Sequence, residues 1–147
     1  MSNLEIAKEI LRGRDYSLVI VRDGRIIYAS RYHGIGGILR AIEELDNRIE
    51  GASVADRVIG KAAALLLAYS KVKDAYALVI SRSGLETLRN HGIQVDYESL
   101  VPKILDRSGR SICPFEKLTL EINSPRLGFE VLRRRWRSLI GESKGSS

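Results

Sequence analysis

The dipeptide Asp23-Gly24 constrains the fold most, because it separates two segments rich in β-branched residues. SLVIVR precedes it and RIIYAS follows it. A two-residue Asp-Gly turn between such segments is the strongest short-range signal for a β-hairpin. The sequence therefore predicts an antiparallel pair of strands near the N-terminus.

Helical patterns flank this hairpin. Ser2 to Glu5 forms an S-x-x-E capping box, and apolar residues then recur at helical spacing as far as Gly13. After the hairpin, apolar spacing predicts a helix from Ile38 to about Ile49. The Ala- and Leu-rich segment RVIGKAAALLLAYS (57–70) predicts a central helix that is buried on several sides.

Strands and helices alternate in the second half of the chain. DAYALVIS (74–81) is typical of a buried strand, and a capping box at Ser83 to Glu86 opens a helix that ends before Gly92. Further predictions are a strand from Ile93, a helix over 97–105, a turn at 106–109 and a helix that begins at Cys113-Pro114. This order predicts a three-layer α/β/α sandwich whose mixed sheet begins with the antiparallel hairpin.

Composition fits one globular domain. The chain has 147 residues, of which 44% are hydrophobic and 29% charged, values typical of folded soluble proteins. No apolar run approaches the roughly 18 residues that cross a bilayer, and no secretion signal opens the chain, so a cytoplasmic protein is expected. We expect an α/β domain over residues 1–125 and a basic helix with a frayed tail over 126–147.

The central segment resembles the cytidine-deaminase-like fold. In that superfamily the central helix opens with a His or Cys zinc ligand, then Ala, then a catalytic Glu, with Ala-Leu three residues beyond. In this sequence the same frame contains Ile59, Gly60 and Lys61, followed by Ala64 and Leu65. The two remaining zinc ligands of the superfamily lie in a P-C-x-x-C turn, which is replaced here by SRSGL (81–85).

The resemblance therefore implies the fold without its zinc chemistry, because all three ligands and the acid/base glutamate are replaced. Cys113 is the only cysteine, so a thiolate cluster for zinc cannot be assembled from one chain. We expect no metal and no cofactor. Over 16–124 the chain is similar to a small prokaryotic family of unknown function with this fold, through GASVADRVIGKAAALLL (51–67) and SICPFEKL (111–118).

The resemblance also places a candidate ligand pocket at the start of the central helix. Lys61 replaces the glutamate there and reverses the local charge, so the pocket is expected to favour a small anionic or nucleotide-like ligand. Ser81, Arg82 and Ser83 at the next strand end add a cation and hydroxyl groups. A lysine that extends into solvent is the alternative, and it stays open.

Glycines and a carboxylate are further candidates for this pocket. Gly34, Gly36 and Gly37 precede a helix and can expose backbone N–H groups to a phosphate, or they can form a structural turn. Asp56 is expected to cap the central helix. Gly60 then either lies in the first turn of that helix or clears space for a ligand.

Cys113 and Glu116 carry a second set of alternatives. If Cys113 is the N-cap of a helix, the helix dipole favours its thiolate, and the residue is a candidate for reactivity. The alternative is a small buried apolar residue, which is the more common role of a free cysteine. Glu116 is expected to complete a capping box in the same helix. An enzyme without zinc that uses Lys61 or Cys113 is thus one alternative function.

Positive charge concentrates at the C-terminus. The net charge is +6, and residues 126–147 contain six Lys or Arg against two Glu. These include Arg133, Arg134, Arg135 and Arg137 around Trp136, a pattern that predicts either phosphate contacts to nucleic acid or the solvated face of a docked helix. Phe129, Leu132, Trp136 and Leu139 supply the apolar face of that helix. A nucleic-acid or protein interaction module is therefore the other alternative function, and the oligomeric state is left open.

Overall fold

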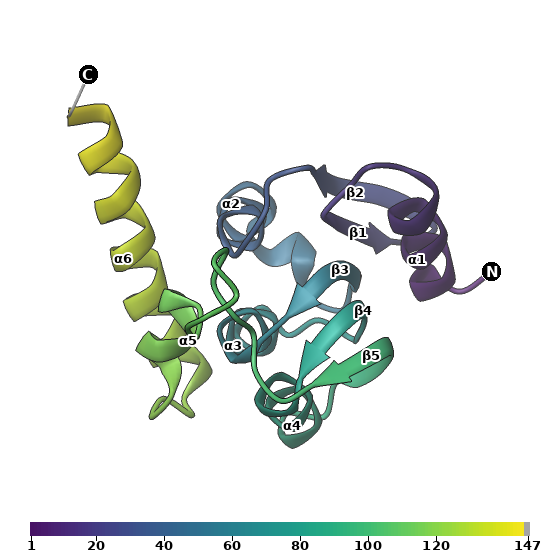
Figure 1. The fold of residues 1–147 in the computed structure, drawn as a ribbon. Helices are drawn as coiled ribbons and strands as arrows, with labels where there is room; N and C mark the ends of the chain where they lie inside the picture. Colours follow the sequence, from purple (N-terminus) through teal and green to yellow (C-terminus); the bar gives the residue numbers. More distant parts are fainter. Residues whose placement is uncertain (146–147) are drawn as a thin grey trace.

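Five strands form one mixed sheet in the order β2-β1-β3-β4-β5 (Figure 1). The computed structural model describes the backbone of residues 1–145 and the side chains of residues 1–141. β1 pairs antiparallel with both β2 and β3, whereas β3, β4 and β5 run parallel. The strands are β1 (Leu18–Arg22), β2 (Arg25–Ser30), β3 (Ser53–Ile59), β4 (Asp74–Ser81) and β5 (Gln94–Val101).

The predicted hairpin is confirmed. Asp23 and Gly24 both have positive φ, 52° and 73°, the conformation that matches a two-residue turn to the twist of its strands. Arg22 pairs with Arg25 directly across the turn. The hairpin therefore sets the antiparallel half of the mixed sheet.

The predicted start of the central helix is wrong. Ser53–Ile59 forms β3, and helix α3 (Lys61–Tyr69) begins only after Gly60. β3 lies between β1 and β4, so strand pairing on both sides satisfies its backbone groups and outweighs the helical preference of the Ala/Leu run that follows. Asp56 consequently lies inside a strand and does not cap a helix.

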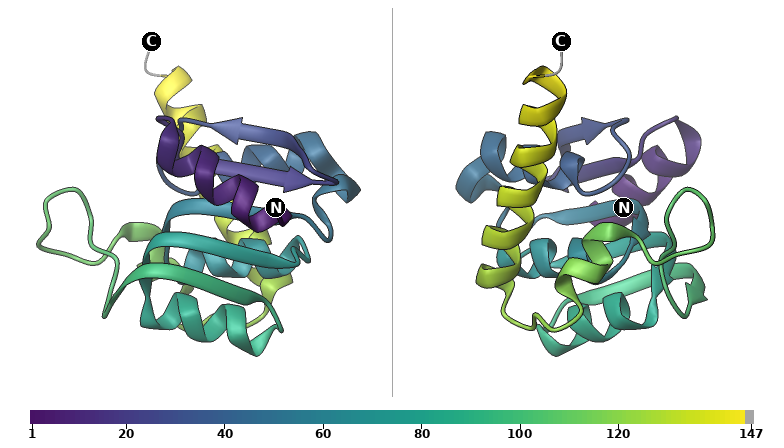
Figure 2. Two further views of the ribbon diagram at one scale, coloured as in Figure 1. Left: turned by 90° about the vertical axis from the view of Figure 1, so that its right-hand side faces the viewer. Right: turned by 60° about the vertical axis from the view of Figure 1, so that its left-hand side comes forward.

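Helices cover both faces of the sheet, as a three-layer sandwich requires. Helix α1 (Asn3–Gly13) packs Ala7 and Leu11 against one face, beside the buried Tyr76. Helices α2 (Gly36–Leu45), α3 and α4 (Arg82–Asn90) cover the other face, with the short 3₁₀ helix Asp46–Ile49 after α2 (Figures 1 and 2). The core on this face includes six consecutive buried residues of α3, Ala62 to Leu67.

The helix predicted over 97–105 is also wrong, because Gln94–Val101 forms the edge strand β5. Most of its side chains are exposed, so the alternation of a half-buried strand is weak in this segment. Pairing with β4 in parallel register decides its conformation. Beyond β5, residues 102–113 form a loop that projects from the body of the protein (Figure 2).

Two helices close the chain. Helix α5 (Pro114–Thr119) leads to the long helix α6 (Pro125–Gly145), which packs on α3. Helix α6 adds the buried Phe129, Leu132 and Trp136 to the core, and Trp136 lies against Gly36 of α2. Leu139, which was expected on the same apolar face, is 37% exposed. The tail that was expected to fray is helical through Gly145, and residues 146 and 147 lie outside the described part of the chain. Within that part, no helix has the length and apolar character needed to cross a membrane.

Candidate functional site

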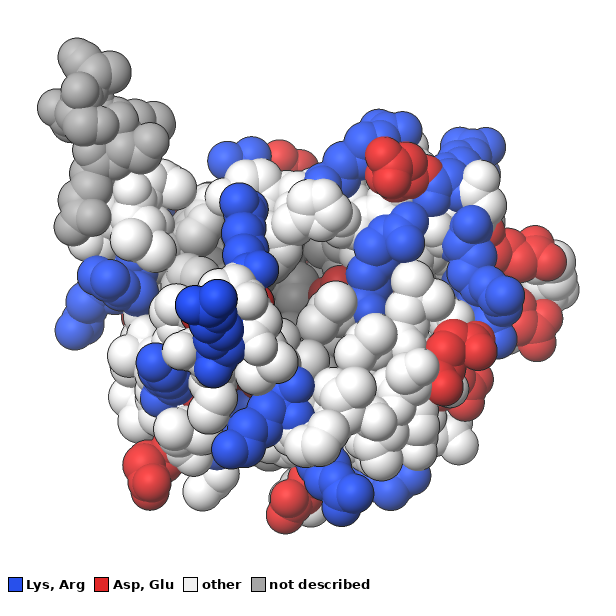
Figure 3. All heavy atoms as spheres, viewed as in Figure 1, with Lys and Arg blue, Asp and Glu red and all other residues white. Residues whose placement is uncertain are grey.

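A cavity of about 700 Å³ opens where β3 meets the starts of α2 and α3. Its volume lies in the range of small-molecule sites. The loop 102–113 and α5 close it on the side opposite the strand, and a hollow is visible near the centre of this face in Figure 3. The apolar part of its lining includes Ile35, Ile38, Ala62, Ala63, Leu105 and Phe115.

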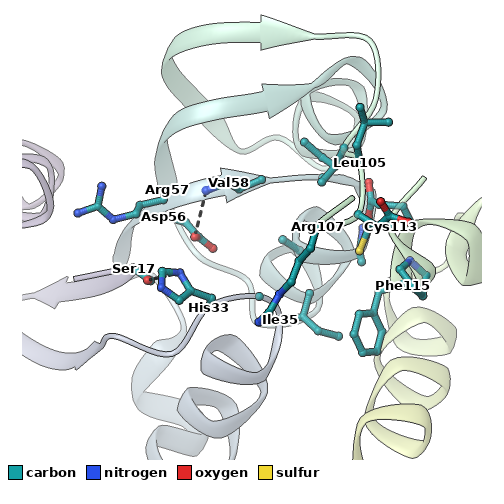
Figure 4. A pocket seen from close by; sticks show the side chains of 18 of the residues that line it. Ser17, His33, Ile35, Asp56, Arg57, Val58, Leu105, Arg107, Cys113 and Phe115 are labelled. Carbon is teal, nitrogen blue, oxygen red and sulfur yellow. Dashed lines mark hydrogen bonds between the residues drawn. The ribbon is translucent and has the colours of Figure 1, made fainter. Parts of the chain in front are cut away.

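Asp56 is the carboxyl group that β3 directs into this cavity (Figure 4). Burial raises the pKa of Asp56 from 3.8 to about 7, and the amides of Val58 and Arg57 oppose this only in part. The bond from the Val58 amide to Oδ1 is long, at 3.4 Å. Asp56 is thus a carboxyl group that can hold or release a proton near neutral pH.

His33 and Ser17 line the cavity beside Asp56. Ser17 Oγ lies 3.3 Å from His33 Nδ1, and the serine is 94% buried. Pairing of the Arg57 amide with the Ser17 carbonyl continues the β1–β3 ladder and keeps Ser17 level with Asp56. The site therefore combines an imidazole, a hydroxyl and a carboxyl group at one end of an apolar cavity.

The two arginines of the lining are directed differently. Figure 4 shows the Arg57 side chain directed away from the cavity, and its guanidinium donates to the carbonyls of Tyr16, Leu11 and Arg14. The Arg107 side chain extends from the loop toward Ile35 and His33 (Figure 4). Arg107 is consequently the cation that faces the cavity from the loop.

Glu116 caps α3, not its own helix, which corrects the expected capping box. Its Oε1 accepts from the Lys61 amide at 2.7 Å and its Oε2 from the Ala62 amide at 2.8 Å, whereas α5 has no side-chain cap. The carboxylate is favoured there because the first N–H groups of α3 lack partners within the helix. The Glu116 carboxylate therefore occupies the start of α3.

Lys61 lies outside the cavity lining. Its Nζ donates to the carbonyl of Leu120 at 2.8 Å, which ties α3 to the residue after α5. Ser81, Arg82 and Ser83 do not line the cavity either: Ser81 Oγ caps α4 by accepting from the Gly84 amide at 3.0 Å and contacts Ser83 Oγ at 3.2 Å. The structure thus does not bring Lys61 and the 81–83 turn together in the cavity.

The other candidates divide between the cavity and the surface. Gly34, Gly60, Cys113 and Glu116 line the cavity with Asp56. Gly36 and Gly37 are buried in the first turn of α2, next to the cavity. Three of the candidate arginines, Arg133, Arg134 and Arg137, surround a separate hollow of about 360 Å³ on α6 together with Glu130.

Sequence reasoning overlooked Ser17, His33 and Arg107 as site residues. None of the three lies in a motif that points to a binding site. The position of Asp56 could have indicated the site. It lies near the carboxyl end of a strand in a mixed sheet, where side chains of neighbouring loops converge. That signal required β3 to be recognised as a strand.

Metal ligands do not cluster in the described part of the chain, where no group of three or more His, Cys, Asp or Glu side chains has the geometry to hold an ion. The lining offers hydrogen bonding by Asp56 and His33 and proton exchange by Asp56, beside apolar walls.

Comparison with known proteins identifies the relatives of this chain. A DUF1893 family protein (TM1506) from Thermotoga maritima is 33% identical and superimposes with a TM-score of 0.84, over 92% of this chain and 91% of that one. RibD of Acinetobacter baumannii is 20% identical (TM-score 0.48, over 55% of this chain and 27% of that one). A T. maritima diaminohydroxyphosphoribosylaminopyrimidine deaminase/5-amino-6-(5-phosphoribosylamino)uracil reductase is 21% identical (TM-score 0.45, over 79% and 38%).

No curated protein matches the sequence. The family described as "TM1506: Domain of unknown function (DUF1893)" matches residues 6–135, nearly the whole of the described fold. The sequence resemblance to a family of unknown function is thereby confirmed. The chain belongs to the DUF1893 family.

Proposed function

We propose that this protein binds a small nucleotide-like molecule in the cavity beside β3, with Asp56 as the group that recognises its ring. The observation that carries the proposal is the placement of one carboxyl group of raised pKa in an otherwise largely apolar cavity. A half-buried carboxylate without a cation beside it is costly unless a ligand supplies hydrogen bonds. A ring N–H or amino group supplies that donor.

The rest of the lining suits the same ligand. A planar ring can pack between Ile38 and Phe115, while Arg107 offers positive charge and His33 a hydrogen-bonding imidazole to an anionic substituent. Glu116 already holds the first amides of α3, so the ligand's anionic group binds elsewhere. The ligand therefore presents donors to Asp56 and keeps its negative charge away from α3.

Calorimetric titration with adenosine, cytidine, guanosine and uridine tests this function. We expect saturable binding of at least one nucleoside, and a loss of tenfold or more in affinity in Asp56→Asn, which retains the size of the side chain. Asp96→Asn, an exposed aspartate on β5, is the matched control and leaves affinity unchanged. The proposal is wrong if none of the nucleosides binds, or if Asp56→Asn binds as tightly as the unaltered protein.

The arginines of α6 support a second candidate function, nucleic-acid binding. Arg126, Arg133, Arg134 and Arg137 lie along one side of the helix, and only Glu130 interrupts them. Arg137 is paired with Glu43 at 2.7 Å and Arg126 with Glu130 at 3.4 Å, which leaves part of the charge for phosphates. Binding to a single-stranded oligonucleotide that falls steeply between 50 and 200 mM salt, roughly as expected for several phosphate contacts, supports this function. Weak binding without salt dependence contradicts it.

A further inference from the structure

The start of α2 differs from that of α3, because no side chain among the described residues takes the place that Glu116 has at the first amides of α3. No side chain caps this helix, no acidic residue lies in its first turn, and its first internal bond runs from the Leu39 amide to the Ile35 carbonyl. Among the described residues, the amides of Gly36, Gly37 and Ile38 make no hydrogen bond of good geometry. All three residues are buried, although buried N–H groups are normally paired.

A second unpaired donor lies against the same turn. Trp136 is 93% buried, and its Nε1 is a buried polar atom without a hydrogen-bond partner among the described residues. Nε1 faces Gly36 so closely that a Cβ on this glycine would lie 2.7 Å from it. An indole nitrogen can only donate, so the missing partner is an acceptor.

A cation completes the arrangement. Arg40, one turn beyond Gly36, holds its guanidinium over the rings of Tyr32 and Trp136, at 4.9 and 5.5 Å from their centroids. The Tyr32 ring also lies against Gly36, so an acceptor has to approach along the end of the helix and not over its side. Gly34, Ile35 and Ile38 line the cavity at this end.

We propose that the start of α2 is a phosphate subsite, in which the amides of Gly36 and Gly37, the indole N–H of Trp136 and Arg40 hold a phosphate group. This inference rests on the proposed function: the phosphate belongs to the nucleotide-like molecule whose ring lies at Asp56. Helix amides, the positive helix end and a guanidinium are the groups that bind phosphate in proteins. The subsite also gives the orphaned indole an acceptor.

The chain contains one tryptophan, so its indole is a direct reporter of this subsite. Inorganic phosphate, titrated at constant ionic strength against chloride, is expected to shift the indole ¹H–¹⁵N resonance of Trp136 in a saturable way. Trp136→Phe keeps an aromatic ring and removes the donor, and we expect phosphate affinity to fall about tenfold without loss of the fold. Arg40→Gln should weaken phosphate binding similarly, whereas Arg135→Gln, an exposed arginine elsewhere on α6, should not.

Comparison of a nucleoside with its 5′-monophosphate separates the two proposals. If the monophosphate binds at least tenfold more tightly and Trp136→Phe abolishes that gain while the nucleoside is unaffected, the subsite is supported. If the nucleoside binds in an Asp56-dependent way but neither phosphate nor the monophosphate moves the indole resonance, the subsite is wrong and the proposed function stands. If phosphate stabilises Trp136→Phe as much as the unaltered protein, the anion binds at another place and the inference is wrong.

Discussion

The carboxylate of Glu116 fills the space in which a side chain at residue 60 would begin. A Cβ built on Gly60 would collide with Oε1 and Oε2 of Glu116, which are themselves bonded to the amides of Lys61 and Ala62. Gly60 is therefore required by a close approach and not by its dihedral angles, since its φ of −98° is open to any residue. The contact between Gly60 and Glu116 therefore joins the end of β3 to α5, across 56 residues of sequence.

Substitution at this contact should be strongly non-additive. Gly60→Ala is expected to destabilise the protein by about 2–4 kcal/mol, because the new methyl group displaces a charge-assisted cap. Glu116→Ala should cost about 2–3 kcal/mol through the loss of the same cap. In the double variant the second change should add less than about 1 kcal/mol, because the contact has already been removed.

Urea unfolding of the four proteins measures this cycle. Glu86→Ala, an exposed glutamate on α4, serves as the control for loss of a carboxylate and should change stability by less than about 0.5 kcal/mol. Full additivity of Gly60→Ala and Glu116→Ala would show that the two residues do not constrain each other.

The raised pKa of Asp56 predicts a specific pH dependence of stability. The folded protein binds this proton more tightly than the unfolded chain, because the pKa is about 7 in the fold against an ordinary value of 3.8. Stability contributed by the protonated group is therefore present at low pH and is lost as pH rises from about 4 through 7. The upper limit is roughly 4 kcal/mol, reduced by any water that reaches the carboxyl group.

Asp56→Asn removes this titration. Relative to the unaltered protein, the variant should gain stability as pH is raised from 5 to 8, and the measurement is the urea midpoint at several pH values. A difference between the two proteins that stays constant with pH would mean that Asp56 ionises normally. Because Asp56 is also the proposed recognition group, the same variant links stability to ligand affinity.

The architecture was largely predictable because its local signals are strong. A few neighbouring residues are enough to indicate three of its elements: the Asp23-Gly24 turn, the Ser2 cap of α1 and the buried strand β4. β3 was missed because Gly60 separates strand from helix inside one apolar run, and only pairing with β1 and β4 decides where the strand ends. Edge strand β5 was missed because its side chains are mostly exposed.

The site was less predictable because it depends on contacts between distant segments. Asp56 was singled out, although with the role of a helix cap, and its carboxyl group lies instead in a cavity with His33 and Ser17. Lys61 was expected to face the same cavity, yet its amine reaches the carbonyl of Leu120, 59 residues away. Local sequence does not indicate where α5 docks, and that docking decides the surroundings of Lys61 and Glu116.

Lys61→Met tests which role the amine has. The side chain keeps its length and apolar contacts but loses one bond to the Leu120 carbonyl, so we expect a loss of about 0.5–1.5 kcal/mol in unfolding free energy. Nucleoside affinity should be unchanged, because Lys61 does not line the cavity. Calorimetry that shows a tenfold loss of affinity in Lys61→Met would instead place the amine at the ligand.

A glycine-to-alanine change should destabilise the protein at one helical position, Gly84, and should not at another, Gly13. A Cβ on Gly84, in the first turn of α4, would lie 2.8 Å from the carbonyl oxygen of Ile59 and 3.1 Å from backbone atoms of Gly60. Backbone atoms cannot move aside as a flexible side chain can, so α4 has to shift away from the end of β3. Gly84→Ala is therefore expected to destabilise the fold by about 2–3 kcal/mol.

Gly13, the last residue of α1, has no atom within 4 Å of such a Cβ and does not have a positive φ. Gly13→Ala should leave stability unchanged or raise it by up to about 1 kcal/mol, because alanine restricts the unfolded chain and favours the helix. Thermal unfolding of both variants measures the contrast. Equal effects at Gly84 and Gly13 would indicate that the close approach of α4 to the end of β3 does not limit packing. In that case α4 could shift away from the cavity wall at Gly60 without loss of stability.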